Sequence, residues 1–222
     1  MKYRLLFLDE ESEFHDHFKD YVDYQENPDI EVLVEFPKSS LQEMLDSIFD
    51  MPVDAVISDY RLNEFKIDID YNVPYDGIEL LEKIQEIRKD FPCFIMTAFD
   101  ANAVDNSQDV NIVYDKGVLL DPTVEDGKNV RFIKKVLKQI DHYKRKLDNA
   151  EKELCDLIEK RSKQDASIED EKRLIELDNL LESSIDRRGE IPNEFKELSN
   201  QNRLSELIKK VDEIISKYET IS

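Results

Sequence analysis

Residues 53–62 read VDAVISDYRL, an apolar run of strand length that ends near a single carboxylate. Small and β-branched residues such as Ala55, Val56 and Ile57 are typical of a strand buried on both faces of a parallel sheet. The run stops at Asp59. Because ligands of open α/β sheets bind beyond the carboxyl ends of the strands, we expect Asp59 at the edge where chemistry takes place. Taken alone, Asp59 is more simply interpreted as a turn residue that closes a strand.

Three further apolar runs are also followed directly by polar residues. These runs are 5–8, followed by Asp9 and Glu10; 94–96, followed by Thr97; and 110–114, followed by Asp115 and Lys116. In chain order the four runs end in an acidic pair, a single Asp, a hydroxyl and a Lys. This ordered set resembles the receiver domain of two-component response regulators.

Segments of strand character alternate with segments whose apolar residues recur at helical spacing. The expected strands are 2–8 and 30–36 together with the runs that end at Asp59, Thr97 and Lys116, and the expected helices are 12–24 (with Ser12 as N-cap), 39–49, 77–88 and, weakly, 100–108. Such alternation indicates βαβ units and a parallel sheet. We predict an α/β fold with a doubly wound, five-stranded, flavodoxin-like sheet in the order 2-1-3-4-5.

From Asp126 onward the pattern changes to long amphipathic helices. Apolar residues recur at alternating steps of three and four, namely Ile133, Val136, Ile140, Tyr143, Leu147, Ala150, Leu154 and Leu157. This heptad stripe predicts a helix over about residues 127–162. A capping-box-like start at Ser167 predicts a second helix, and apolar residues at 204–218 predict a third after Pro192.

The change of pattern divides the chain into a receiver domain, residues 1–125, and a helical output or interaction region, residues 126–222. Three amphipathic helices with short connections favour an antiparallel bundle within one chain. The alternative is a coiled coil in which the long helix pairs with its copy in a homodimer.

The formal net charge of −21 argues against direct nucleic-acid binding, which needs a basic face to neutralise phosphates. It also disfavours an anionic membrane surface. Basic clusters occur at Lys134 and Lys135 and again at Lys144, Arg145 and Lys146. Because apolar residues interrupt them at helical spacing, we interpret these clusters as the solvated face of a helix.

Cys93 falls in an expected buried strand and Cys155 in an expected helix, so the two cysteines form neither a disulfide framework nor a paired metal motif. A reducing cytoplasm is the simplest location. The chain opens directly into a strand, so we expect no signal peptide. No apolar run approaches the roughly 20 residues that span a bilayer.

The resemblance implies phosphoryl transfer from a histidine kinase or a phosphotransfer protein. It implies that Asp59 is the phosphoacceptor, since a carboxylate oxygen can act as a covalent nucleophile. It further implies that Thr97 and Lys116 bind the remaining oxygens of the acyl phosphate. Ala98, which follows Thr97, is the small residue expected at that position.

The resemblance also implies a Mg²⁺ cofactor, because a hard cation with oxygen ligands neutralises phosphoryl oxygens. The implied ligands are the carboxylates of Asp9, Glu10 and Asp59 and the backbone carbonyl of Arg61. The order Asp-Glu in the acidic pair is less usual in receivers than Asp-Asp or Glu-Asp.

Three features depart from the receiver pattern. Residues 63–72 are an insertion before Gly77, either a tolerated loop or a lid over the site. Gly117 stands where a Pro normally follows the lysine in a cis peptide, and its freedom of backbone dihedral angles can preserve the turn. The usual aromatic switch position is Val113, and the adjacent Tyr114 is more simply a residue at the edge of the core.

The three histidines do not suggest a metal site. His15 and His17 are two residues apart, do not share a helical face, and are expected at the surface. The residues around His142 match neither a phosphotransfer helix nor a kinase dimerisation helix.

We therefore expect a signalling module rather than an enzyme with its own catalytic output. Phosphorylation of the receiver would switch a helical region that binds a protein partner or dimerises. Alternatives are a phosphorylation-independent adaptor, a phosphate sink, or a helical region that hides an output enzyme or phosphatase.

Overall fold

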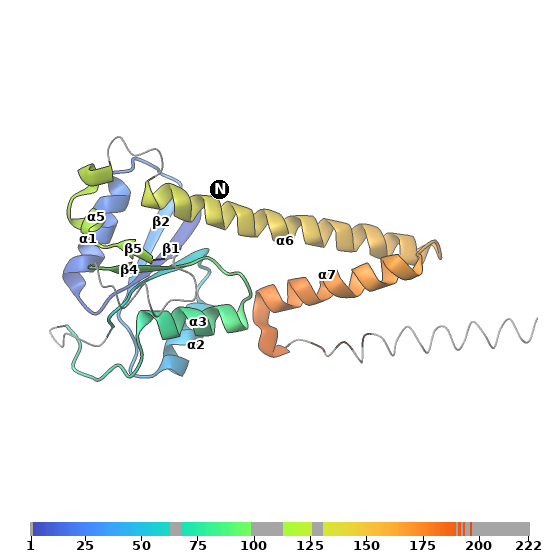
Figure 1. Cartoon of the computed structure of the whole chain (residues 1–222), viewed down its shortest axis with the longest axis horizontal. Coiled ribbons are helices and arrows are strands. Elements are labelled where there is room, and N and C mark those ends of the chain that lie inside the picture. Colours follow the sequence, from blue (N-terminus) through green and yellow to red (C-terminus); the bar gives the residue numbers. More distant parts are fainter. Residues whose placement is uncertain are drawn as a thin grey trace, which may run out of the picture. The chain divides into compact units, whose positions relative to one another are not determined.

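The computed structural model describes residues 2–62, 68–98, 113–125 and 131–189, together with Ile191, Asn193 and Lys196. The chain divides into two compact units, residues 1–148 and 149–222. The sheet lies in the first unit (Figure 1). The division between residues 148 and 149 falls within one long helix, whereas the sequence pattern predicts a domain boundary before that helix. The functional division at residue 125 stays a prediction.

Five parallel strands form one sheet in the order β2-β1-β3-β4-β5. Their bounds are β1 Tyr3–Leu8, β2 Ile30–Glu35, β3 Ala55–Asp59, β4 Cys93–Thr97 and β5 Val113–Asp115. This order confirms the predicted doubly wound fold. Every residue of β3 and β4 is buried, as expected for strands covered on both faces. The carboxyl ends of the strands meet at one edge, where Asp59 is paired with Met96 and Thr97 with Asp115.

Helices cover both faces of this sheet (Figure 1). Their bounds are α1 Ser12–Asp23, α2 Leu41–Asp50, α3 Gly77–Ile87, α5 Gly117–Leu120, α6 Phe132–Ser162 and α7 Ile168–Asp186, with short 3-10 turns at Pro122–Glu125 and Arg187–Gly189. The weak helix predicted over residues 100–108 lies outside the described residues.

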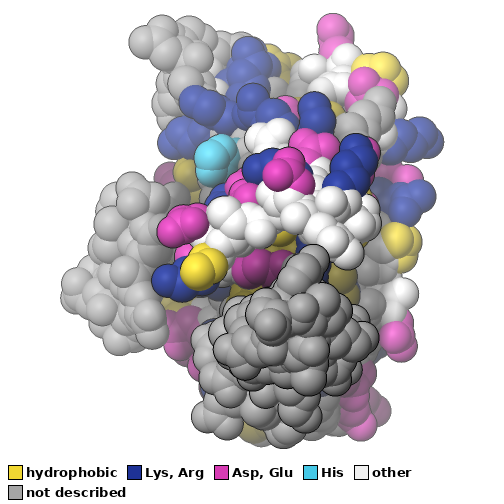
Figure 2. Space-filling model, turned by 90° about the vertical axis from the view of Figure 1, so that its right-hand side faces the viewer, with side chains coloured by type: hydrophobic (Ala, Val, Ile, Leu, Met, Phe, Trp, Pro, Cys, Tyr) yellow, Lys and Arg dark blue, Asp and Glu magenta, His cyan; other side chains and the backbone are white. Residues whose placement is uncertain are grey.

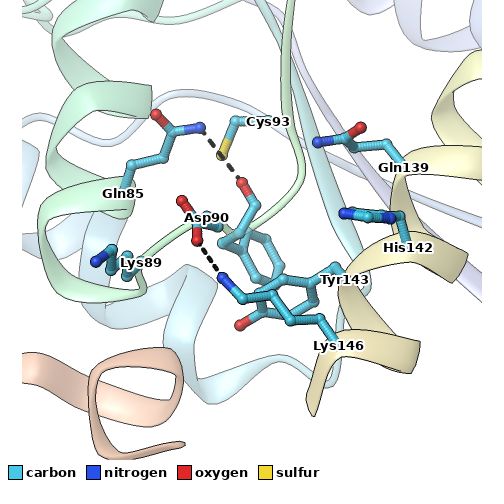
Figure 3. A pocket seen from close by; sticks show the side chains of 9 residues that line it. Gln85, Lys89, Asp90, Cys93, Gln139, His142, Tyr143 and Lys146 are labelled. Carbon is cyan, nitrogen blue, oxygen red and sulfur yellow. Dashed lines mark hydrogen bonds and ion pairs between the residues drawn. The ribbon is translucent and has the colours of Figure 1, made fainter. Parts of the chain in front are cut away.

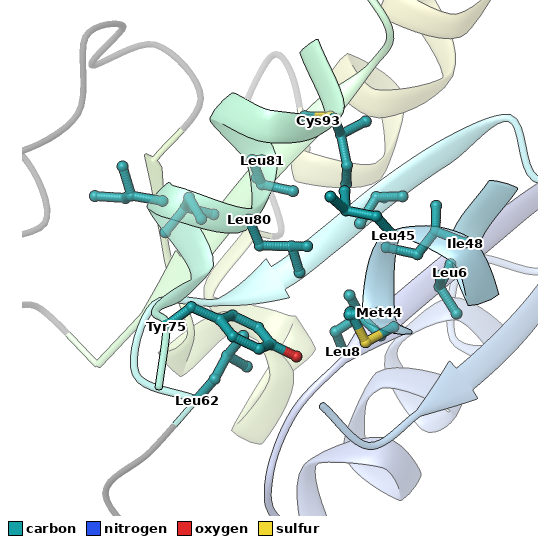
Figure 4. Packing of buried hydrophobic residues seen from close by; sticks show 14 of the residues in the cluster. Leu6, Leu8, Met44, Leu45, Ile48, Leu62, Tyr75, Leu80, Leu81 and Cys93 are labelled. Atoms are coloured by element: carbon teal, nitrogen blue, oxygen red, sulfur yellow. The ribbon is translucent and has the colours of Figure 1, made fainter. Parts of the chain in front are cut away.

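Alternation along the strands divides the apolar residues of the first unit between two clusters. Leu6 and Leu8 of β1 pack with α2 and α3 in one cluster, which Figure 4 shows in close-up. Leu5 and Phe7 pack with α1, α5 and the first part of α6 in the other cluster. The sheet therefore lies between two packed apolar layers.

The start of α6 is fixed by the buried side chains of Tyr21 and Glu125. The Tyr21 hydroxyl donates to Glu125 Oε2 at 2.7 Å and accepts from the backbone N–H of Ile133 at 3.2 Å. The other oxygen, Glu125 Oε1, accepts from the backbone N–H of Phe132 at 2.9 Å. Two N–H groups that no helical carbonyl can reach are thereby satisfied, and a carboxylate lies at the positive end of the helix dipole.

Tyr21→Phe should lower the free energy of unfolding by about 1–3 kcal/mol, because a buried Glu125 oxygen and the Ile133 N–H lose their partner. Urea denaturation followed by circular dichroism measures this loss. Tyr24→Phe is the matched control, since Tyr24 is 41% exposed. We expect that control to change stability by less than about 0.5 kcal/mol. A similarly small change in Tyr21→Phe would show that the Tyr21–Glu125 pair is not important for stability.

The second unit contains the distal half of α6 and α7, which run antiparallel. Glu153 pairs with Arg173 at 2.7 Å, and Lys160 pairs with Asp170 at 3.2 Å, so positions later in α6 meet positions earlier in α7. Ala150, Leu157 and Leu177 form the small buried cluster of this unit. The third predicted helix, with apolar residues at 204–218, lies outside the described residues.

The predicted capping box at the start of α7 is present. The Ser167 hydroxyl accepts from the backbone N–H of Asp170 at 3.1 Å, and the Asp170 carboxylate accepts from the Ser167 N–H at 3.0 Å.

None of the helices within the described ranges is long and apolar enough to cross a membrane.

The two cysteines are both free and differ in exposure. Cys93 is buried in β4, and burial raises the pKa of its thiol, whereas Cys155 is exposed. Because the thiolate is the reactive form, iodoacetamide should label only Cys155 in the folded protein and both cysteines in guanidinium. Peptide mapping by mass spectrometry distinguishes the two positions. Equal labelling rates in the folded protein would be inconsistent with a closed core around Cys93.

Candidate functional site

Lys116 connects two carboxylates at the carboxyl edge of the sheet. Its Nζ lies 2.7 Å from Asp9 Oδ2 and 3.0 Å from Asp59 Oδ1. All three residues are buried, with exposed fractions of 5% for Lys116, 0% for Asp9 and 7% for Asp59. The parallel topology explains this meeting, because β1, β3 and β5 all end at the same edge.

Backbone N–H groups hold the second oxygen of each carboxylate. The N–H of Glu11 donates to Asp9 Oδ1 at 3.1 Å, and the N–H of Arg61 donates to Asp59 Oδ2 at 2.9 Å. Each carboxylate is thus fixed from two sides, by Lys116 and by a main-chain amide. The role of the Arg61 carbonyl as a metal ligand stays a prediction.

Burial and the neighbouring charges shift the pKa values of this cluster in opposite directions. Burial raises the pKa of Asp59 to about 6, although the nearby Lys116 ammonium acts to lower it. Burial likewise raises the pKa of Asp9 against the effect of Lys116. For Lys116, burial acts to lower the pKa, but Asp59 and Asp9 outweigh it and the pKa is raised. A buried carboxylate that is costly to keep charged is a frequent property of functional sites.

Thr97 is buried at the end of β4 and is linked to Lys116 through the main chain. The Lys116 N–H donates to the Thr97 carbonyl at 2.8 Å. The turn that follows is closed by the Gly117 N–H, which donates to Asp115 Oδ1 at 2.8 Å. Gly117 does not use the left-handed region, so the turn forms here without the additional backbone freedom of glycine. Lys116 has helical angles, φ −66° and ψ −17°, which lead directly into α5.

The acidic cluster fits Mg²⁺ in its chemistry, since carboxylate oxygens are the ligands that this ion prefers. Asp9, Glu10 and Asp59 are all buried and carry three formal negative charges against one on Lys116. Their arrangement is different from that of a metal site. Within the described ranges, no three acidic, His or Cys side chains are grouped closely enough to hold a metal ion. The Lys116 ammonium connects Asp9 to Asp59 instead.

An aromatic ring that sequence reasoning missed lies against the lysine. Phe14 of α1 places its ring centroid 3.5 Å from Lys116 Nζ, a cation–π contact. The helical spacing of the apolar residues in α1 places Phe14 on its inward side, but local periodicity does not reveal which distant side chain a ring covers. Phe14 therefore belongs to the site because its ring contacts Lys116, although no sequence motif marks it.

The aromatic residue of β5 packs at the edge of the core, as expected. Tyr114 is half-buried, with its ring centroid 4.7 Å from that of Phe132 and Lys135 Nζ 4.9 Å from its ring. Val113 is also half-buried and packs against the α2–α3 cluster. This packing agrees with a structural role for Tyr114.

The described part of the insertion is a packed segment. Asp68 Oδ2 accepts from the N–H of Ser12 at 2.8 Å, so Asp68 caps α1, and Ser12 is the first helical residue rather than the expected N-cap. Ile69 is buried, and the Tyr71 hydroxyl donates to the Pro37 carbonyl at 2.7 Å. Residues 63–67 lie outside the described part of the chain, and the lid alternative stays a prediction.

Gly77 lies where the chain comes back from the insertion to the end of β3. Its N–H donates to the Tyr60 carbonyl at 2.8 Å, and a Cβ placed on it would overlap the backbone carbonyl of Asp59. The preceding Asp76 caps α3 by accepting from the Glu79 N–H at 2.9 Å. The Asp-Gly pair is thus explained by two roles: Asp76 caps α3, and Gly77 leaves room for the backbone carbonyl of Asp59.

His15 is buried, so its predicted surface position is wrong. Its Nε2 lies 3.1 Å from the Asp9 carbonyl oxygen, and its ring centroid lies 4.6 Å from that of Phe36. Burial lowers the pKa of His15. The helical spacing explains the error, because His15 lies three residues before Phe18 on the inward face of α1. His17 remains partly exposed.

Comparisons with known proteins return similarities among solved structures only. No family model matches the chain, and no curated protein matches it. The non-phosphorylated receiver domain of RcsB from Escherichia coli is 15% identical, with a TM-score of 0.42, over 58% of this chain and 96% of that one. A putative response regulator from Chloroflexus aurantiacus is 17% identical, with a TM-score of 0.39, over 57% and 97%.

A CheY-like receiver domain protein from Methanospirillum hungatei is 16% identical, with a TM-score of 0.39, over 66% of this chain and 99% of that one. The receiver-like fold that the sequence predicted is confirmed by this chain's own strand order, 2-1-3-4-5. The roles of the individual site residues stay predictions.

Proposed function

We propose that this protein is a phosphoacceptor receiver of a two-component phosphorelay, in which Asp59 accepts a phosphoryl group. One observation supports this most directly: Asp59 and Asp9 are buried together at the carboxyl edge and are joined by Lys116. The donor would be a histidine kinase or a phosphotransfer protein. The protein would itself be a signalling module of the cytoplasm, without a separate catalytic output.

In this reaction an Asp59 carboxylate oxygen attacks the phosphorus of phosphohistidine in line with the leaving nitrogen. The O–P bond of an acyl phosphate forms, the N–P bond breaks, and the leaving imidazole takes up a proton. Lys116, held beside Asp59, would bind a phosphoryl oxygen, and the Thr97 hydroxyl would donate to another. The backbone N–H of Arg61 orients the attacking carboxylate.

Asp9, Glu10 and Asp59, with the Arg61 carbonyl, would hold Mg²⁺ only after their side chains regroup around the ion, because in this structure Lys116 Nζ lies between Asp9 and Asp59. When bound, the ion supplies positive charge that offsets the phosphoryl oxygens. The Lys116 ammonium already neutralises part of the charge of Asp9 and Asp59, so the two cations would share this cluster.

The output would be carried by the helical region, as a change in protein binding or dimerisation. The Tyr21–Glu125 pair supports this proposal, because it fixes the start of α6 within the receiver core. Movement of the loop that holds Lys116 would reach this pair through α5 and the following 3-10 turn.

A second candidate, a phosphorylation-independent adaptor, is favoured by the closure of the site. Asp59 is only 7% exposed, and Phe14 lies against Lys116. A phosphodonor reaches Asp59 only if these groups move. Mg²⁺ titration separates the candidates, because a working acidic cluster binds the ion and a permanently ion-paired one does not.

Intact-mass measurement after incubation with acetyl phosphate and Mg²⁺ tests the proposal, with size-exclusion chromatography and light scattering on the same samples. We expect a gain of one phosphoryl group, and a change in oligomeric state if dimerisation is the output. No gain of mass, with or without Mg²⁺, would favour the adaptor.

A further inference from the structure

The first half of α6 is strongly basic in an acidic chain. Residues 131–146 contain seven Lys or Arg residues and one acidic residue, Asp141. This segment carries a formal charge of +6, which leaves −27 for the rest of a chain whose total is −21. Figure 2 shows Lys and Arg side chains gathered near a histidine on one face of the molecule.

Four side chains of this segment form an exposed stripe along one side of α6. Lys134, Lys138, His142 and Arg145 follow one another at steps of four, four and three, which places them on one helical face, and all four are exposed. Lys134 and Lys138 make no side-chain hydrogen bond or ion pair with the part of the chain that the structure describes. We call these four residues the basic stripe.

Other cations of the segment are already engaged within the first unit. Lys144 pairs with Asp54 at 2.8 Å, and Lys146 pairs with Asp90 at 2.7 Å. Arg131 donates to Gln25 Oε1 at 3.1 Å, and Lys135 Nζ lies 4.9 Å from the centroid of the Tyr114 ring. The basic stripe lies beside these internally engaged cations.

A cavity of about 480 Å³ adjoins the stripe, between α6 and the loop that joins α3 to β4. Phe91 and Tyr143 form its aromatic floor, edge to face at 5.8 Å between ring centroids. Polar side chains line the cavity from the side of α3 and its following loop and from the side of α6, as Figure 3 shows. These side chains are Gln85, Lys89, Asp90, Gln139, His142 and Lys146.

Hydrogen-bond donors outnumber acceptors in this cavity. The side chains of Lys89, Gln139 and His142 make no hydrogen bond or ion pair with any described residue. Asp90 is the one acidic residue in the described lining, and it is paired with Lys146. The cavity therefore suits a ligand group that is anionic and accepts hydrogen bonds.

We propose that the cavity and the basic stripe together bind an acidic segment of a partner protein. A carboxylate side chain of the partner enters the cavity beside Lys89 and His142. The neighbouring acidic residues lie along the stripe on Lys138 and Lys134. This proposal does not depend on phosphorylation of Asp59.

The length of the stripe favours a peptide over a small molecule. From Lys134 to Arg145 the helix rises about 17 Å, at about 1.5 Å per residue. An extended peptide covers that distance with five or six residues, at about 3.3 Å each. A nucleic acid is disfavoured because the charge of −27 on the rest of the chain repels a long polyanion, whereas a short acidic segment stays on the stripe.

Fluorescence anisotropy on the full-length protein tests the proposal with a defined probe. The probe is a fluorescein-labelled peptide of about eight residues with alternating Glu and Ser, long enough to cover the stripe at about 3.3 Å per residue. A peptide with Gln in place of Glu and an oligothymidylate of equal charge are the comparison ligands. We expect saturable binding of the Glu peptide only, weakened as salt is raised from about 20 to about 150 mM.

Lys89→Glu combined with Lys138→Glu should weaken binding of the Glu peptide by about tenfold or more, since each change places like charges together. The matched control is Lys152→Glu combined with Lys172→Glu, two exposed cations outside the stripe, which should change the dissociation constant by less than about twofold. Circular dichroism checks that both double variants are folded. No binding of the Glu peptide, equal weakening in the two double variants, or tighter binding of the oligothymidylate would each overturn the proposal.

Discussion

Asp59→Asn should gain no phosphoryl group from acetyl phosphate and Mg²⁺ under conditions in which the unaltered protein gains one. An amide oxygen at this position is too weak a nucleophile to form the acyl phosphate. The Asn side chain keeps the shape of Asp and still offers an acceptor for the Arg61 N–H. Intact-mass spectrometry reads out the loss directly.

The same variant should remain folded, which separates a chemical effect from a structural one. Burial already raises the pKa of Asp59 to about 6, so the charged carboxylate is poorly stabilised where it lies. A neutral side chain of the same shape removes that cost, while Lys116 keeps its partner Asp9. We expect the melting temperature of Asp59→Asn to equal or exceed that of the unaltered protein.

Asp115→Asn is the matched control for the chemistry. Asp115 is exposed and lies at the same sheet edge, and its contact with the Gly117 N–H needs only an acceptor oxygen. This control should take up phosphate like the unaltered protein. If Asp59→Asn were still labelled, the phosphoacceptor would be another residue, and peptide mapping would locate it.

Gly77→Ala should destabilise the fold by about 1–3 kcal/mol or more, because an added Cβ overlaps a backbone atom that cannot move alone. That atom is the carbonyl oxygen of Asp59, and the Asp59 carbonyl carbon would lie only 3.0 Å away. Relief requires α3 or the end of β3 to shift, which displaces Asp59 from Lys116. We therefore expect lower stability in urea and a lower rate of phosphate uptake in the same variant.

Gly117→Ala is the matched control, because the atom nearest to an added Cβ at this position belongs to a side chain that can move. An added Cβ there would meet Asp115 Oδ1 at 3.1 Å, and this atom belongs to an exposed side chain that can turn away. We expect a change in stability below about 1 kcal/mol. Equal losses in the two variants would mean that the backbone approach at Gly77 is not the cause.

The sequence was sufficient to predict the fold and the residues that gather at the functional edge. Apolar runs that each end in a polar residue mark the strands, and a parallel sheet brings their carboxyl ends together. Asp9, Asp59 and Lys116 could be placed side by side for this reason, before any contact was known.

Contacts between segments far apart in the chain could not be predicted in this way. Phe14 contacts Lys116 across about a hundred residues, and Asp68 caps α1 at Ser12 across 56. The periodicity of one helix or strand indicates which of its faces points inward, but it does not indicate which residues of other segments that face contacts. His15 is buried despite its polarity because it lies on the inward face of α1, which the polarity of the residue alone does not indicate.

The fixed start of α6 has a mechanical consequence. Within the first unit the helix extends from Phe132 to Asp148, which is about 24 Å at about 1.5 Å per residue. A tilt of about 5° at the Tyr21–Glu125 anchor would displace Asp148 by about 2 Å, by the same helical rise. Such a lever would convert a rearrangement too small to alter the receiver core into a displacement large enough to make or break a protein contact.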